Sequence, residues 1–166
     1  MISMTRRVFV KRLVGFCLTA AAAFTDFFRP GASRAQTSTG SVQPEEKVEA
    51  TMKRLFGART MAPGDGKVKL EMPMIAEDGS NVPVTVQAEF PMTASRYVKN
   101  IYIISDNNRR PLNARFSFAP EAGKAYIATS LRLGMTTDVR AVAEMNDGTL
   151  YMVKREVKVT VGGCGG

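Results

Sequence analysis

The 166-residue sequence contains no histidine and only two cysteines, Cys17 and Cys164. Without histidine, a Ser-His-Asp triad, a Cys-His nucleophile pair and every histidine-ligated metal site are excluded. Two cysteines so far apart form neither a CxxC redox pair nor a structural zinc site. There is also no glycine-rich loop followed by a helix that would bind phosphate. The sequence therefore shows no motif of a catalytic site.

The acidic residues do not supply such a site either. Several lie at predicted turns, namely Asp65, Glu77, Asp78, Asp106 and Asp147. Carboxylates at turns usually accept hydrogen bonds from nearby backbone N–H groups, and no spacing pairs these as general acid and base. We therefore predict a protein that is not an enzyme, with no catalytic residue, no metal and no cofactor.

The amino-terminal segment has the pattern of an export signal. Arg6 and Arg7 lie in Thr5-Arg-Arg-Val-Phe-Val-Lys11, which fits the twin-arginine motif. An apolar run from Leu13 to Phe24 comes next, too short to span a bilayer, and Ser33-Arg-Ala35 offers the small residues that a signal peptidase requires. We predict a twin-arginine signal peptide over residues 1–35 and a periplasmic protein without a membrane anchor.

Removal of this segment changes both the charge and the cysteine content. The whole chain has a formal net charge of +8, but six basic residues and only one acidic residue lie in the first 35. The remaining basic residues are scattered among acidic ones, which argues against nucleic-acid binding. Cys17 leaves with the signal, so Cys164 remains alone. An unpaired cysteine in an oxidising compartment indicates either an intermolecular disulfide or a reactive thiol.

Residues 36–66 are predicted to form a polar leader, a helix and a linker. Pro44-Glu-Glu46 is suited to the first helical turn, and Gly57 is placed to end the helix. One face of this helix is apolar, and we expect it to pack on the domain or on a partner. Its residues are Val48, Met52, Leu55 and Phe56. A turn-rich link, Ala62–Gly66, comes after the helix.

From residue 67 the pattern of apolar residues changes to a period of two, which is typical of strands. Seven candidate strands are separated mostly by turn signals such as Asn146-Asp-Gly148. They are Lys67–Ile75, Val82–Phe90, Tyr97–Ile104, Asn113–Ala119, Ala125–Leu133, Asp138–Met145 and Leu150–Val161. This number of short strands predicts an all-β, immunoglobulin-like antiparallel β-sandwich over residues 67–161. The usual burial of methionine and phenylalanine places four further side chains in its core: Met72, Met74, Met92 and Phe116.

The chain ends in a short tail, residues 162–166, that differs from everything before it. Cys164 stands between two pairs of glycines, Gly162 and Gly163 on one side and Gly165 and Gly166 on the other. Such a glycine-rich tail is expected to be mobile and adds no side-chain bulk. About three extended residues would carry the cysteine roughly 10 Å beyond the last strand. We interpret the tail as a thiol on a swinging arm, slim enough to enter the active site of another protein.

These features together resemble the SoxY family of bacterial sulfur-oxidation proteins over about residues 67–166. The resemblance rests on the terminal Gly-Gly-Cys-Gly-Gly after Val157–Val161 and on the twin-arginine leader. Further matching stretches are Ala76–Gly79 with Val82–Val84, Tyr97–Lys99, Gly123–Ala125, and Val139–Glu144 with Asp147-Gly148. The chain departs from the family pattern at Thr129–Leu133, where a more basic strand is expected, and at Met135–Asp138.

The resemblance implies a covalent carrier in thiosulfate oxidation, with Cys164 as the attachment point. A c-type cytochrome would couple thiosulfate to the thiol, giving a cysteine S-thiosulfonate. A dinuclear-metal hydrolase would release sulfate, and a molybdenum/haem dehydrogenase would oxidise the remaining sulfane. A second β-sandwich protein, SoxZ, would form a heterodimer with this chain. Metals and redox centres would thus belong to the partners.

Three other interpretations remain. Cys164 could serve only an intermolecular disulfide in a structural periplasmic subunit, although such a bridge gains nothing from four loose glycines. The terminal Gly165-Gly166 carboxylate could carry sulfur, as in ubiquitin-like carriers, but those need neither an export signal nor a cysteine. A hydrolase or oxidase is opposed by the missing histidine. A Cys164→Ser variant separates these interpretations: it would abolish the cysteine carrier role, merely remove dimers of a structural subunit, and leave a carboxylate carrier active.

Overall fold

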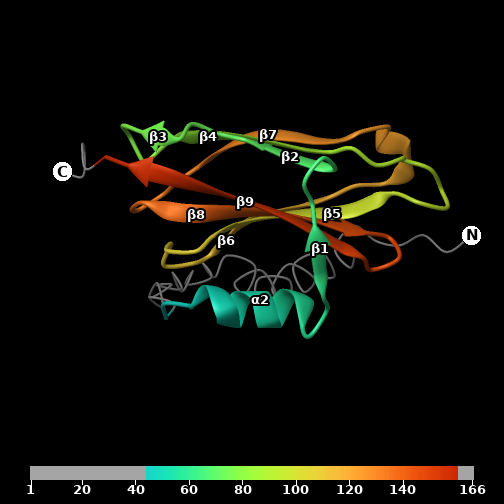
Figure 1. The fold of residues 1–166 in the computed structure, drawn as a ribbon, viewed down its shortest axis with the longest axis horizontal. Coiled ribbons are helices and arrows are strands. Elements are labelled where there is room, and N and C mark those ends of the chain that lie inside the picture. The colour runs from blue at the N-terminus through green and yellow to red at the C-terminus, as the bar shows by residue number, and fades with distance from the viewer. Residues whose placement is uncertain (1–43, 161–166) are drawn as a thin grey trace, which may run out of the picture. The chain divides into compact units, whose positions relative to one another are not determined.

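The computed structural model describes residues 44–160, which form three layers in Figure 1: a helix, a larger sheet and a smaller sheet. The helix is α2 (Val48–Phe56). The strands are β1 (Met61–Pro63), β2 (Val68–Glu71), β3 (Ile75–Ala76), β4 (Val82–Ala88), β5 (Val98–Ser105), β6 (Leu112–Ser117), β7 (Ala125–Leu131), β8 (Thr137–Met145) and β9 (Leu150–Val159). A short 3-10 helix, η1 (Pro120–Ala122), precedes β7. The predicted β-sandwich with a short helix before it is confirmed.

The two sheets differ in size and in strand order. The larger sheet runs β1-β9-β8-β5-β6, with β3 also paired to β9, and the smaller sheet runs β2-β4-β7. Most neighbours are antiparallel, but β1 and β3 pair with β9 in parallel. Within residues 44–160 no helix is long and apolar enough to cross a bilayer.

Strands β5 and β8 lie at the centre of the larger sheet and are buried on both faces. Ile101 and Ile103 of β5 pack in the core between the two sheets, whereas Tyr102 and Ile104 pack in a second cluster with Phe56 of α2. Strand side chains alternate between the two faces of a sheet, so a strand covered on both sides is apolar at nearly every position. This explains the unbroken apolar stretch Ile101–Ile104 in β5.

Helix α2 covers the larger sheet through the face predicted from the sequence. The Phe56 ring lies edge-on to Tyr102, with 5.0 Å between the ring centroids. Gly57 ends the helix with φ at 63°, and its N–H donates to the Lys53 carbonyl at 2.8 Å. The predicted start at Pro44 is wrong, because Lys47 is still extended and the helix begins at Val48. The residues before the helix instead contact the segment between β5 and β6, where the Glu46 N–H donates to the Arg109 carbonyl at 3.1 Å.

The predicted strand 67–75 is wrong as a single element. It divides into β2, in the smaller sheet, and β3, in the larger one. Pro73 lies at the crossing, where its missing N–H makes a continuous ladder unfavourable. Met74 beside it is 72% exposed, so its predicted place in the core is also wrong. By contrast, Met72, Met92 and Phe116 pack against the core as predicted.

The turn-rich link before residue 67 contains a strand that the sequence pattern did not indicate. Strand β1 pairs with the first residues of β9, from Met61↔Leu150 to Pro63↔Met152. The Gly64 N–H then donates to the Met152 carbonyl at 2.9 Å. On the edge that faces away from β8, strand β9 is therefore paired with β1 at its start and with β3 at its end. Between these two partners, that edge of β9 has no paired strand.

Candidate functional site

The predicted attachment residue and its arm lie outside the described residues, as do Arg6 and Arg7 of the export signal. Cys164, Gly162, Gly163, Gly165 and Gly166 therefore stay predictions. The structure does describe the part of the chain from which this arm begins, the end of β9 and Thr160.

The end of β9 is fixed on one side by β3. Ile75 pairs with Lys158 and Ala76 with Val159. The Lys158 N–H donates to the Met74 carbonyl at 2.9 Å, and the Thr160 N–H donates to the Ala76 carbonyl at 3.0 Å. The backbone is thus anchored up to Thr160, four positions before Cys164 in the sequence.

The other side of this strand end is held by β8 and the residue before it. Thr137 pairs with Val157, and the Val159 N–H donates to the Thr136 hydroxyl at 3.0 Å. Both edges of the strand are therefore occupied where the chain leaves the sandwich (Figure 1). The strand is therefore held firmly at the point where the described residues end.

A tight loop between β3 and β4 closes against the same place. The Leu133 N–H donates to the Gly79 carbonyl at 2.7 Å. A Cβ atom at Gly79 would overlap the Leu133 carbonyl oxygen and lie 2.9 Å from Val159 Cγ1, so only glycine fits. Asp78 accepts hydrogen bonds from the Ser80 N–H at 2.8 Å and hydroxyl at 2.7 Å, which lower the pKa of its carboxyl. The prediction that Asp78 caps a turn is confirmed.

Exposed apolar side chains gather around this strand end. Met74 is 72% exposed, Ile75 58% and Met135 57%. Met74 and Ile75 belong to the segment that pairs with Lys158, and Met135 directly precedes Thr136, which binds Val159. We call these three residues the β9 rim. Among the described residues, one further large apolar side chain is exposed, that of Tyr126. Exposed apolar patches commonly mark surfaces that meet another molecule.

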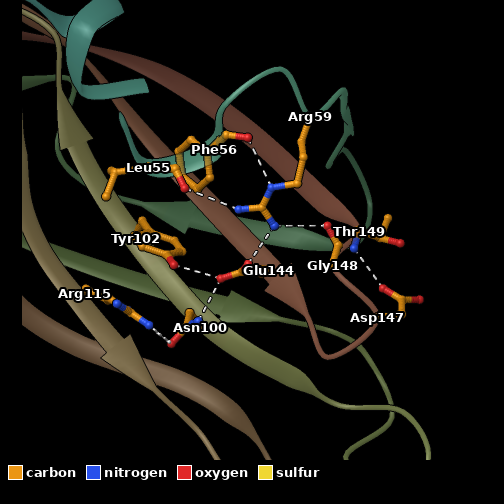
Figure 2. Close-up of polar contacts among 10 residues, drawn as sticks. All are labelled: Leu55, Phe56, Arg59, Asn100, Tyr102, Arg115, Glu144, Asp147, Gly148 and Thr149. Carbon is orange, nitrogen blue, oxygen red and sulfur yellow. Dashed lines mark hydrogen bonds and ion pairs between the residues drawn. The ribbon is translucent and has the colours of Figure 1, made fainter. Parts of the chain in front are cut away.

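A buried polar cluster, which the sequence analysis missed, lies at the other end of the sandwich (Figure 2). The Glu144 carboxylate accepts hydrogen bonds from Arg59 at 2.8 Å, from the Asn100 amide at 2.7 Å and from the Tyr102 hydroxyl at 2.7 Å. Burial raises the pKa of this carboxyl, but the three donors and the Arg59 charge together lower it below its ordinary value. Arg115 in turn donates to the Asn100 side-chain oxygen at 3.3 Å.

This cluster does not contribute to the candidate site. Glu144 pairs with Leu150 at the start of β9, whereas the arm begins at the end of that strand. Every oxygen of the carboxylate has a donor, and Arg59 links the segment after α2 to the sheet. Its role is therefore to fix the helix segment on the sheet. The sequence signal was the pair of polar residues, Asn100 and Glu144, which directly adjoin the apolar stretches Ile101–Ile104 and Ala141–Ala143.

Two further turn carboxylates, Asp147 and Asp106, give one confirmation and one correction. The Asp147 carboxylate accepts from the Thr149 N–H at 2.8 Å, as predicted for a turn. Asp106 instead forms a two-pronged ion pair with Arg140, at 2.7 and 2.6 Å, so its prediction as a backbone cap is wrong. Within residues 44–160, no three acidic, cysteine or histidine side chains lie together in a way that could hold a metal ion.

Comparison with known proteins decides the family. The sequence profile of the sulfur oxidation protein SoxY matches residues 52–164, which include the cysteine of the tail. The chain belongs to the SoxY family. The sulfur carrier protein SoxY from Chlorobium limicola f. thiosulfatophilum has a similar structure, with a TM-score of 0.58 and 30% identity over 69% of this chain and 97% of that one.

A second structural neighbour shares the fold alone. A superoxide reductase (neelaredoxin) from Ignicoccus hospitalis matches with a TM-score of 0.50 and 20% identity, over 57% of this chain and 80% of that one. No curated protein sequence matches the chain. This chain thus shares the sandwich with a superoxide reductase, and the fold by itself does not indicate a function.

Proposed function

We propose that this chain is a covalent carrier of sulfur-oxidation intermediates, with Cys164 as the attachment point on a swinging arm. Membership of the SoxY family and the similarity to a sulfur carrier support this role. The observation that carries it is the anchored end of β9, which holds the backbone up to Thr160 and is surrounded by the apolar β9 rim.

The length of the arm explains why such a rim is useful. Four extended residues reach at most about 14 Å, so Cys164 cannot react far from Thr160. A partner enzyme whose active site lies inside a channel must therefore bring its surface close to the strand end. Met74, Ile75 and Met135 lie where that contact would occur. The rim supports a function in which the body docks while the thiol enters the partner.

The proposed chemistry takes place on the sulfur atom of Cys164. A c-type cytochrome accepts two electrons as the thiol and thiosulfate form a cysteine S-thiosulfonate, with release of one proton. A dinuclear-metal hydrolase then adds water across the terminal S–S bond and releases sulfate, leaving a cysteine persulfide. A molybdenum/haem dehydrogenase oxidises the remaining sulfane sulfur. The carrier itself supplies only the thiol.

The setting proposed for this chemistry is the periplasm, reached by the twin-arginine route, in a heterodimer with a SoxZ-like β-sandwich subunit. Arg6 and Arg7 support the export route. The second candidate function is a structural subunit in which Cys164 forms only an intermolecular disulfide. The four glycines around Cys164 favour the carrier, because a purely structural bridge gains nothing from so loose a tail.

The test is the intact mass of the exported protein, purified from cells that consume thiosulfate, before and after a reductant. A reductant-sensitive adduct on the C-terminal peptide, with the mass of thiosulfonate or added sulfur, is expected. The Cys164→Ser variant is the matched control and should carry no adduct. Only free thiol or a plain protein disulfide during thiosulfate consumption would contradict the carrier role and favour the structural subunit.

A further inference from the structure

The free sheet edges of the described residues differ in how well they are protected against pairing with another chain. Edge strands expose unpaired N–H and C=O groups, and proteins usually blunt them with charges, prolines, bulges or short length. Strand β2 has four residues and includes Lys69 and Glu71. Strand β6 contains Arg115, and its pairing with β5 shifts register between Ile103 and Ile104.

The middle of β9, between its β1 and β3 partners, carries charges as well: Lys154, Arg155 and Glu156. Strand β7 has none of these protections. It contains seven residues, Ala125–Leu131, with no charge and no proline. Its pairing with β4 runs from Val82↔Leu131 to Ala88↔Ala125 without a shift of register.

The direction of the backbone groups on β7 can be deduced from the pairing of β4 on its other side. The Glu89 N–H donates to the Lys67 carbonyl at 2.7 Å, toward β2. Because backbone groups alternate along a strand, those of Val84 and Val86 point toward β7 and bond their partners there. On β7 this leaves the N–H and C=O groups of three alternate residues at the open edge: Tyr126, Ala128 and Ser130.

The surroundings of this edge indicate what kind of strand it suits. Lys124 and Arg132 stand exposed immediately before and after β7, so the neutral strand has a positive charge at each end. Tyr126, 50% exposed, lies on its outer side, and tyrosine is enriched at protein interfaces. In an antiparallel pairing of two copies centred on Ala128, Lys124 of one copy would face Arg132 of the other, which is unfavourable.

We propose that the β7 edge binds an edge strand of the partner β-sandwich subunit, extending the smaller sheet across the two proteins. The strand that fits is uncharged in its middle and acidic at its ends. Backbone hydrogen bonds from Tyr126, Ala128 and Ser130 would supply the pairing, as in other cases of strand addition. This inference rests on the heterodimer of the proposed function and is independent of the chemistry of Cys164.

The first test measures binding of the SoxZ subunit to the exported chain carrying Cys164→Ser, which prevents disulfides. Ala128→Pro removes one N–H at the open edge and no hydrogen bond to β4. It should weaken binding by about tenfold or more, since a strand pairing is interrupted. The matched control is Thr85→Lys, which lies opposite Ala128 in register and places a charge on the same outer face of the sheet. It should leave binding almost unchanged.

The second test needs no substitution at the edge. Amide hydrogen exchange is compared in the free chain and in the heterodimer. The N–H groups of Tyr126, Ala128 and Ser130 should exchange rapidly when free and become protected in the complex, while those of Ile127 and Thr129 are protected in both. This alternation is specific to pairing through a strand edge.

Several results would overturn the inference. Equal loss of binding in Thr85→Lys would assign the contact to the sheet face, and unchanged exchange at the three amides would place it elsewhere. Protection in this chain without SoxZ would assign the edge to a second copy. Absence of any heterodimer would overturn it too, while adducts on Cys164 would still be judged separately by mass.

Discussion

The two outer faces of the sandwich are built in opposite ways. On the larger sheet, large apolar side chains such as Tyr102 and Ile104 point outward, and α2 covers them with Phe56. On the smaller sheet the outward residues other than Tyr126 are small or polar, and no described helix or strand lies over them (Figure 1). A face that needs burial for stability is closed within the chain, while a face that is stable in water stays available to other molecules.

The largest expected effect comes from removing the main contact of the covered face. Phe56 is 2% exposed and packs edge-on against Tyr102. Phe56→Ala should lower the free energy of unfolding by about 3–5 kcal/mol, because it leaves a cavity between α2 and the sheet. Urea denaturation followed by circular dichroism measures this loss. A change below about 1 kcal/mol would mean that the helix contributes little to the fold.

The next effect concerns the polar cluster beneath the same helix. Glu144→Gln replaces one acceptor oxygen by a donor group, which then faces donors from Arg59, Asn100 or Tyr102. We expect a loss of about 2–3 kcal/mol at neutral pH, the range for a buried hydrogen-bonded charge left unsatisfied. The matched control is Asp147→Asn at the exposed turn, which should cost far less in the same denaturation experiment.

The pH dependence of this variant gives a third prediction. The pKa of Glu144 is lowered in the folded protein from its ordinary value of 4.5, so its contribution to stability is fully present above that value. It is lost as the pH falls through the lowered pKa, because the carboxyl then takes up a proton. The stability gap between wild type and Glu144→Gln should therefore shrink from neutral pH to about pH 3. A gap that stays constant would show that the charge of Glu144 is not what matters.

A smaller effect is expected where the two sheets meet at the end of β9. Gly79→Ala places a methyl group against the Leu133 carbonyl and Val159 and should cost about 1–3 kcal/mol, the usual range for overpacking. It should also speed hydrogen exchange at Lys158 and Thr160, whose N–H groups bond the segment before this loop. Gly134→Ala is the control in the same region, since a Cβ there meets nothing within 4 Å.

The smallest effect is expected on the uncovered face. Tyr126 is half exposed, and Tyr126→Ala should change stability by no more than about 0.5 kcal/mol. The same denaturation experiment as for Phe56→Ala measures it. A loss comparable to that of Phe56→Ala would remove the distinction between the two faces.

Local patterns allowed most of the sandwich to be predicted. Alternation in β4 and β7, the Asn146–Gly148 turn and the apolar stripe of α2 depend on neighbouring residues, which the sequence displays directly. The parallel pairing of β1 and β3 with β9 could not be predicted in this way. These strands have three and two residues, too few for any periodicity, and they exist because β9 offers a free edge.

Of the candidate site, the sequence allowed the reactive group to be predicted but not the surface around it. The composition of the tail and its position at the end of the chain predict Cys164 as the attachment point. The β9 rim was not predictable, since Met74, Ile75 and Met135 are the kind of residue that normally fills a core. The exposure of Met74 and Ile75 follows from the break at Pro73, where the chain crosses from the smaller sheet to the larger one.

The anchor at Thr160 has a consequence for reaction rates. A thiol tied about 14 Å or less from a fixed point explores a small volume once a partner is docked there. In the proposed carrier role, its effective concentration in front of the partner's active site would be on the order of millimolar or higher, whatever the concentration of carrier in solution. A loose anchor would enlarge that volume and dilute the thiol. In that role, the short parallel pairing of β3 with β9 would keep the thiol at a high local concentration.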